Sequence, residues 1–138
     1  MRWEGECTVR NIKIYRPPGR AAPMEKFISM LDCKLQHKIR WQFFRLSQAE
    51  LCDMKEPHFK HFALERYKRF YELREKNKIL VRIIFTIDDS SGDIVLLVPF
   101  IKRQPRDTML ALEASIGMLA EIRKDPDCAV KFDYFKEV

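Results

Sequence analysis

The chain has 138 residues, 46% of them hydrophobic and 33% charged, a balance that excludes a disordered chain and predicts one globular domain. We expect its core to span about residues 8–124, with a tail over residues 125–138. A net charge of +6 favours an anionic partner such as nucleic acid or an acidic protein, although solubility alone explains it equally well.

The cysteines and the N-terminal residues indicate where the protein works. Cys7, Cys33, Cys52 and Cys128 show no CxxC spacing, and the few histidines complete no zinc pattern. We therefore expect free thiols that pack in the interior, no metal and no other cofactor. The opening MRWEGECTVRN lacks the apolar run of a signal peptide, and no apolar segment approaches the length of a membrane span. These features predict a cytoplasmic protein without a membrane partner.

The first third of the chain predicts a strand and a helical hairpin. Alternation over Thr8–Tyr15 predicts a strand, and the prolines of RPPGR at residues 16–20 end it because they lack an N–H. From Pro23 onward, apolar residues at three- and four-residue steps predict an amphipathic helix, divided near Asp32, which can cap a second helix. The apolar positions are Phe27, Ile28, Leu31, Leu35, Ile39, Phe43 and Leu46.

The stretch KEPHFKHF at residues 55–62 is interpreted as a polar loop broken by Pro57. Its two histidines, His58 and His61, lie beside lysines just ahead of the next strands. Imidazoles in such surroundings can bind phosphate or transfer protons near neutral pH, which stays open as an alternative to an ordinary loop.

Three runs rich in β-branched and aromatic residues follow, over residues 69–75, 80–87 and 94–100. The short polar connections between them predict an antiparallel meander. Pro99 cannot donate to a ladder, so the third strand is expected to lie at an edge or to carry a bulge there. Basic residues run through the sheet and predict a cationic surface; they are Arg69, Arg74, Arg82, Lys102 and Arg103.

A helix is predicted from Thr108, after Pro105, to about Lys124. Its apolar stripe must pack on another element, most simply the sheet; the stripe consists of Met109, Leu112, Ile116, Leu119 and Ile122. Alternation in the tail, at Val130, Phe132 and Tyr134, favours an added edge strand.

Three segments carry a resemblance to a known family: YELR at Tyr71–Arg74, VRIIF at Val81–Phe85 and LLVPFIKR at Leu96–Arg103. In this order, and followed by a helix led by proline and threonine, they resemble the RelE/ParE superfamily of bacterial toxins, nearest its HigB-like, phage-associated branch. The resemblance covers roughly residues 9–124. It implies a RelE-like α+β fold of order β-α-α-β-β-β-α, in which a helical hairpin and a C-terminal helix pack on a small twisted antiparallel sheet.

The resemblance implies the toxin of a type II toxin–antitoxin pair, most simply a metal-independent, ribosome-dependent mRNA endonuclease that inhibits translation. The implied partners are mRNA on the ribosome and a cognate antitoxin of helix-turn-helix type, encoded next to the toxin. Two non-catalytic alternatives stay open, a gyrase-poisoning toxin of the ParE type and an inactive relic that binds only its antitoxin. A plain RNA-binding module ranks last, because the chain lacks the glycine-and-aromatic strand signature of RRM-type domains.

RNA cleavage of this kind needs cations that hold the crowded phosphate, and arginine suits the role because its planar fork stays charged. Strand alternation puts Glu72 and Arg74 on one face and turns Arg82 away from the core. We therefore predict that Arg74 and Arg82 stabilise the phosphate, with a salt bridge to Glu72 or Glu65 as the alternative role of Arg74. The predicted RNA-binding residues are Lys55, Lys60, Lys102 and Arg103.

The acid and the base are harder to assign. Val98 and Pro99 stand where many HigB-like relatives carry a basic residue. His58, His61 and Tyr134 are therefore the candidate acid–base groups.

Overall fold

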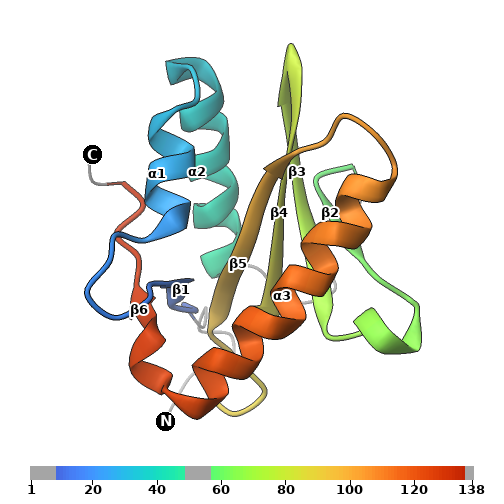
Figure 1. The fold of residues 1–138 in the computed structure, drawn as a ribbon. Coiled ribbons are helices and arrows are strands. Elements are labelled where there is room, and N and C mark those ends of the chain that lie inside the picture. Colours follow the sequence, from blue (N-terminus) through green and yellow to red (C-terminus); the bar gives the residue numbers. More distant parts are fainter. Residues whose placement is uncertain (1–8, 49–56, 136–138) are drawn as a thin grey trace, which may run out of the picture.

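The computed structural model describes residues 9–48 and 57–135 (Figure 1). Its strands are β1 (Ile12–Tyr15), β2 (Phe59–His61), β3 (Phe70–Asn77), β4 (Ile79–Ile87), β5 (Ile94–Ile101) and β6 (Ala129–Lys131). Its helices are α1 (Pro23–Ser29), α2 (Cys33–Gln48) and α3 (Arg106–Lys124), with 3-10 turns η2 (Glu65–Tyr67) and η3 (Pro126–Cys128). The predicted α+β class is confirmed, and the predicted strands and helices all occur in the expected order.

The strands form one sheet in the order β2-β3-β4-β5-β1-β6. β3, β4 and β5 make the predicted antiparallel meander, and β6 lies antiparallel to β1 at the edge, as the tail alternation indicated. The pairing of β1 with β5 is parallel, so the sheet is mostly rather than wholly antiparallel. Local turn chemistry cannot reveal this pairing, because the whole α1–α2 hairpin and three strands separate β1 from β5 in the chain.

β2 corrects the interpretation of residues 55–62 as a loop. Phe59 pairs with Leu73, and the short strand extends the sheet beyond β3. A strand of three residues is too short to show a two-residue period in the sequence. β2 therefore forms only because it pairs with β3.

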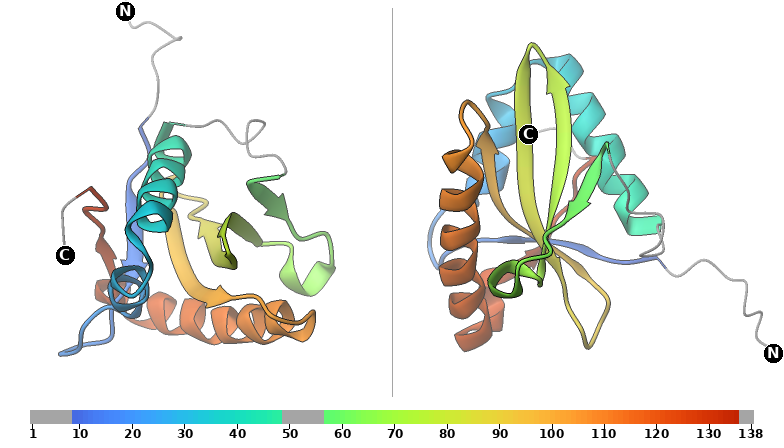
Figure 2. Two further views of the ribbon diagram at one scale, coloured as in Figure 1. Left: turned by 90° about the horizontal axis from the view of Figure 1, so that it is seen from above. Right: turned by 90° about the vertical axis from the view of Figure 1, so that its right-hand side faces the viewer.

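Helices cover both faces of the sheet (Figures 1 and 2). The α1–α2 hairpin packs on one side, here called the hairpin face, where Phe43 of α2 lies in one buried cluster with Leu73 and Phe85. α3 packs on the other side, here called the α3 face, where Leu112 lies in a second cluster with Phe70. The predicted division of the hairpin at residue 32 is confirmed, because the Asp32 Oδ1 atom accepts a hydrogen bond of 2.9 Å from the Leu35 N–H.

The register between β4 and β5 slips at one point. Ile84 lies opposite Val98 and Phe85 lies opposite Leu96, which leaves Leu97 as an extra residue on β5. Leu97 and Val98 both join the apolar cluster of the α3 face. β1 pairs with β5 only from residue 94 to residue 96, so within the described sheet Pro99 has β4 alone as its neighbour. The expected bulge therefore occurs two residues before Pro99, at Leu97, and β5 is an inner strand whose far side has no described partner at Pro99.

None of the described helices has the length and apolar character needed to cross a membrane. Cys128 is buried, as expected of a packing residue, whereas Cys33 is exposed. Cys7 and Cys52 lie outside the described residues.

Candidate functional site

Two arginines and one carboxylate meet on the α3 face. Arg74 of β3 and Arg82 of β4 are direct cross-strand partners, so their side chains leave the sheet side by side. Glu72, two residues before Arg74, shares this face, and its side chain is only 1% exposed. Its Oε1 atom lies 2.9 Å from the Arg74 Nε atom and 3.7 Å from the Arg82 Nε atom. We call these three residues the Arg–Glu–Arg cluster.

In the cluster, one carboxylate faces two guanidinium groups. Burial lowers the pKa of Arg82, the charge of Glu72 opposes this change, and the charge of Arg74 adds to it. An arginine starts from so high a pKa that it still stays protonated at neutral pH. The Arg74 and Arg82 side chains are 22% and 13% exposed, so part of each side chain reaches the surface.

Hydrogen bonding in the cluster is incomplete. The Glu72 Oε2 and Arg82 Nε atoms are buried and have no hydrogen-bond partner in the described part of the chain. A buried polar atom without a partner costs stability, and natural proteins leave few of them. The position is therefore a candidate for a bound group that would complete the pairing.

Three of the predicted RNA-binding cations lie around the cluster. Lys60 of β2 is the cross-strand partner of Glu72 and so shares the α3 face. Beyond the end of β5, the Lys102 N–H donates a hydrogen bond of 2.8 Å to the Leu80 carbonyl, two residues along β4 from Arg82. The basic surface therefore extends over the strands on either side of β4.

Arg103 lines a groove of about 480 Å³ between β5 and α3. Phe100 also lines this groove and is the cross-strand partner of Arg82, so the groove borders the cluster. Lys55, the fourth predicted cation, lies outside the described residues.

Of the candidate acid–base groups, only His58 contacts a residue of the cluster, and it does so through its backbone, because its ring lies beside Glu75 on the hairpin face. Its carbonyl accepts a hydrogen bond of 2.7 Å from the Arg74 N–H. Its Nδ1 atom lies 3.7 Å from the Glu75 Oε2 atom, a suitable distance for an ion pair when the imidazole is protonated. The Gln42 amide of α2 donates a hydrogen bond of 2.6 Å to the same Glu75 oxygen and so orients this carboxylate.

His61 and Tyr134 lie elsewhere. The His61 Nε2–H donates a hydrogen bond of 2.6 Å to the Lys68 carbonyl, and its ring lies 4.6 Å from the ring of Tyr71. Tyr71 stacks on Phe85 of the hairpin face, on the other side of the sheet from Arg74. Tyr134 packs against α2 and donates a hydrogen bond of 3.3 Å to the Ser47 hydroxyl. The structure does not bring either residue to the cluster.

A clamp between η2 and α3 was not foreseen from the sequence. Arg66 donates two hydrogen bonds, of 2.8 and 2.6 Å, to the two carboxylate oxygens of Glu113, and the Tyr67 hydroxyl donates another to Glu113. No local pattern points to this contact, since 47 residues separate Arg66 from Glu113. The clamp holds the connection between β2 and β3 against α3.

The clamp predicts a loss of stability in acid. Hydrogen bonds from Arg66 and Tyr67 lower the pKa of Glu113 from 4.5 to about 2. Because the folded-state pKa is the lower one, the stabilisation is complete above pH 4.5 and is lost as the pH falls through 2. We therefore expect the free energy of unfolding, measured with urea, to fall less from pH 7 to pH 3 in Glu113→Gln than in the wild type. Glu65→Gln, which removes an exposed carboxylate, should behave like the wild type.

Residues 26–112 match the family model described as Phage derived protein Gp49-like (DUF891). The chain belongs to this family. The matched stretch is more than half of this Gp49-like protein and runs from α1 into α3, so it contains the whole Arg–Glu–Arg cluster. The family is associated with the toxins of toxin–antitoxin systems. Neither a curated protein nor a solved structure matches the chain.

Proposed function

We propose that this Gp49-like protein is the toxin of a toxin–antitoxin pair, related to the HigB-like branch of the RelE/ParE superfamily, and that it cuts mRNA on the ribosome without a metal ion. One observation carries the proposal: Arg74 and Arg82 leave adjacent strands side by side and share a single carboxylate. Such a pair can neutralise a phosphate whose negative charge grows during reaction.

In the proposed reaction the ribose 2′-hydroxyl attacks the adjacent phosphorus and the bond from phosphorus to the 5′ oxygen breaks. The base takes the 2′-hydroxyl proton and the leaving 5′ oxygen takes a proton from water, so the products are a 2′,3′-cyclic phosphate and a 5′-hydroxyl. In this proposal Arg74 and Arg82 hold the non-bridging oxygens by charge-assisted hydrogen bonds. Lys60, Lys102 and Arg103 hold neighbouring backbone phosphates, which makes binding dependent on salt.

We assign the role of general base to His58, whose ring lies on the hairpin face and would reach the cluster by turning around β2, the edge strand of the sheet. An imidazole can accept the 2′-hydroxyl proton near neutral pH, and a carboxylate at Nδ1 orients the ring. Glu75 supplies that carboxylate, and its side chain is only 9% exposed. The backbone hydrogen bond between Arg74 and His58 supports a role for His58 over one for His61 or Tyr134.

Mapping mRNA 5′ ends in cells that express the protein tests the activity. We expect cuts inside translated reading frames, in phase with codons, that disappear when translation initiation is blocked. His58→Ala should lower the cleavage rate about 100-fold, because general-base catalysis contributes roughly 10²–10⁴-fold. His61→Ala is the matched control and should cut like the wild type.

A non-catalytic toxin is the second candidate, favoured by the ion pair between Arg74 and Glu72. In that case the cluster has a structural role and the basic surface only binds a partner. Gyrase–DNA adducts that accumulate without codon-phased cuts would select this candidate. In either case the proposed inhibitor is an antitoxin encoded beside the toxin, and co-purification of the adjacent gene product tests that partner.

A further inference from the structure

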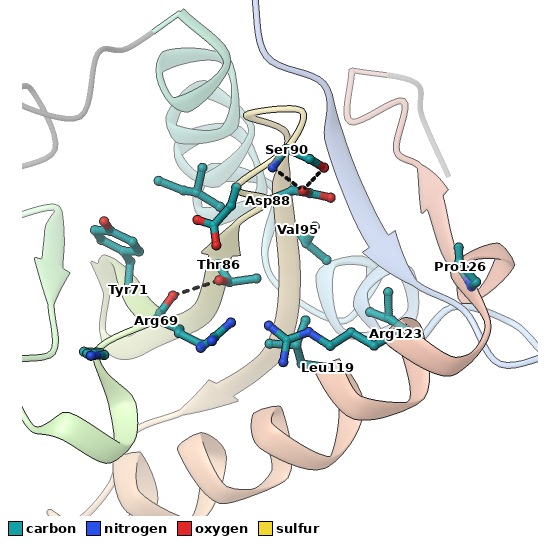
Figure 3. Close-up of a pocket in the computed structure, with 13 residues that line it drawn as sticks. Arg69, Tyr71, Thr86, Asp88, Ser90, Val95, Leu119, Arg123 and Pro126 are labelled. Atoms are coloured by element: carbon teal, nitrogen blue, oxygen red, sulfur yellow. Dashed lines mark hydrogen bonds between the residues drawn. The ribbon is translucent and has the colours of Figure 1, made fainter.

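A cavity of about 690 Å³ lies at the other end of the α3 face (Figure 3). Val95 of β5 and Leu119 and Ile122 of α3 give it an apolar wall, and the β4–β5 connection closes one side. Thr86 of β4 also lines it, and four residues along a strand put Thr86 roughly 13 Å from Arg82. The cavity is therefore separate from the Arg–Glu–Arg cluster, and its volume suits a small ligand.

Arg69 and Arg123 line this cavity and extend their side chains toward one another, one from the start of β3 and one from α3 (Figure 3). Neither side chain forms an ion pair or a hydrogen bond with any described residue, whereas the neighbouring Lys68 pairs with Glu65 at 2.5 Å. The C-terminal end of the α3 dipole favours a cation at residue 123, whereas among residues 9–48 and 57–135 no carboxylate forms an ion pair with Arg69. Two guanidinium groups directed at one point repel each other unless an anion lies between them.

The other end of the cavity is acidic. Asp88 lies there, away from both guanidinium groups (Figure 3), and its Oδ1 atom accepts hydrogen bonds of 2.9 and 2.8 Å from the Ser90 N–H and hydroxyl. These bonds lower the pKa of Asp88, so the carboxylate is ionised at neutral pH. Asp89 lines the same cavity. Carboxylates accept hydrogen bonds from hydroxyl groups and repel a second anion, so a ligand must be anionic at one end only.

We propose that this cavity binds a nucleoside phosphate, with the phosphate between Arg69 and Arg123 and the ribose hydroxyls toward Asp88 and Asp89. The apolar wall accommodates the less polar face of the nucleoside. The phosphate belongs either to a free nucleotide or to an RNA strand, and the chemistry recognised is the same. The proposal does not depend on RNA cleavage, because it involves none of the residues assigned to that reaction.

Isothermal titration of the full chain with four probes tests the proposal: adenosine 5′-monophosphate, adenosine, inorganic phosphate and a short 5′-phosphorylated RNA. We expect the nucleotide or the RNA to saturate one site and to bind more tightly than either adenosine or phosphate. Arg69→Gln and Arg123→Gln should each weaken that binding about ten-fold, as expected for the loss of a charge-assisted contact. Asp89→Asn should weaken nucleotide binding but not phosphate binding.

Lys124→Gln is the matched control, since it removes the same charge from the next residue of α3, which does not line the cavity. It should change affinity less than two-fold, and circular dichroism should show all variants folded. Saturation by the nucleotide or by the RNA alone supports the proposal and identifies the source of the phosphate. Absence of binding by both, or an equal loss in Lys124→Gln, overturns it, whatever the outcome of the mRNA-cleavage experiment.

Discussion

Replacing Arg82 with alanine is expected to abolish growth arrest while the protein remains folded. The change removes one of two guanidinium groups that face the proposed reacting phosphate, but it keeps the closer ion pair, at 2.9 Å, between Arg74 and Glu72. Losing one donor of this kind costs about 100- to 1000-fold in rate. Growth of expressing cells and cleavage of translated mRNA measure the effect.

Two further variants refine this experiment. Arg82→Lys keeps the charge but loses the planar fork, so its activity should lie between those of the wild type and Arg82→Ala. Arg106→Ala removes an exposed arginine at the start of α3 and should leave toxicity unchanged. Full toxicity of both Arg82→Ala and Arg74→Ala would show that the cluster is not the functional site.

Replacing Glu72 with glutamine is expected to lower the free energy of unfolding by about 3 kcal/mol, because it leaves buried cations without their counter-charge. The carboxylate is 1% exposed and lies within 4 Å of two guanidinium groups, so water cannot take its place. Urea denaturation followed by circular dichroism measures the loss. Glu65→Gln, at a side chain that is 83% exposed, should change stability by less than about 0.5 kcal/mol.

The same variant separates a structural role of the cluster from an electrostatic one. If Glu72→Gln is studied at a temperature where it is still folded, it should bind RNA more tightly at low salt than the wild type does, because one negative charge beside the two arginines is gone. A change in stability below about 1 kcal/mol would mean that Glu72 does not hold the arginines in place. Unchanged RNA binding would mean that RNA does not contact this face.

Much of the fold was predictable because its signals are local. The three- and four-residue spacing from Phe27 to Leu46 predicted the α1–α2 hairpin, and the two-residue period of the central strands predicted the meander. That period also put Glu72 and Arg74 on one face and Arg82 away from the core, and the structure has the same arrangement. The short polar connections fixed the strand order β3-β4-β5, since brief turns join neighbouring antiparallel strands.

The candidate site was only partly predictable, because its assembly depends on long-range packing. Alternation indicates which face a side chain occupies, but not which groups from distant elements will meet there. It could not separate His58, whose backbone carbonyl binds the Arg74 N–H, from His61, whose ring contacts Tyr71. Nor could it show that Tyr134 packs on α2, a helix that lies far from Tyr134 in the sequence.

By itself, the sequence determined the helices, the central strands and the face on which each arginine lies, because these follow from the period of neighbouring residues. Only the tertiary structure decided that β1 joins β5 in parallel, that β2 forms at all, and that α3 packs on the face that carries the arginines. It alone brought Arg69 to Arg123 around one cavity. Such pairings depend on burial of apolar surface between segments far apart in the chain, and no local pattern records them.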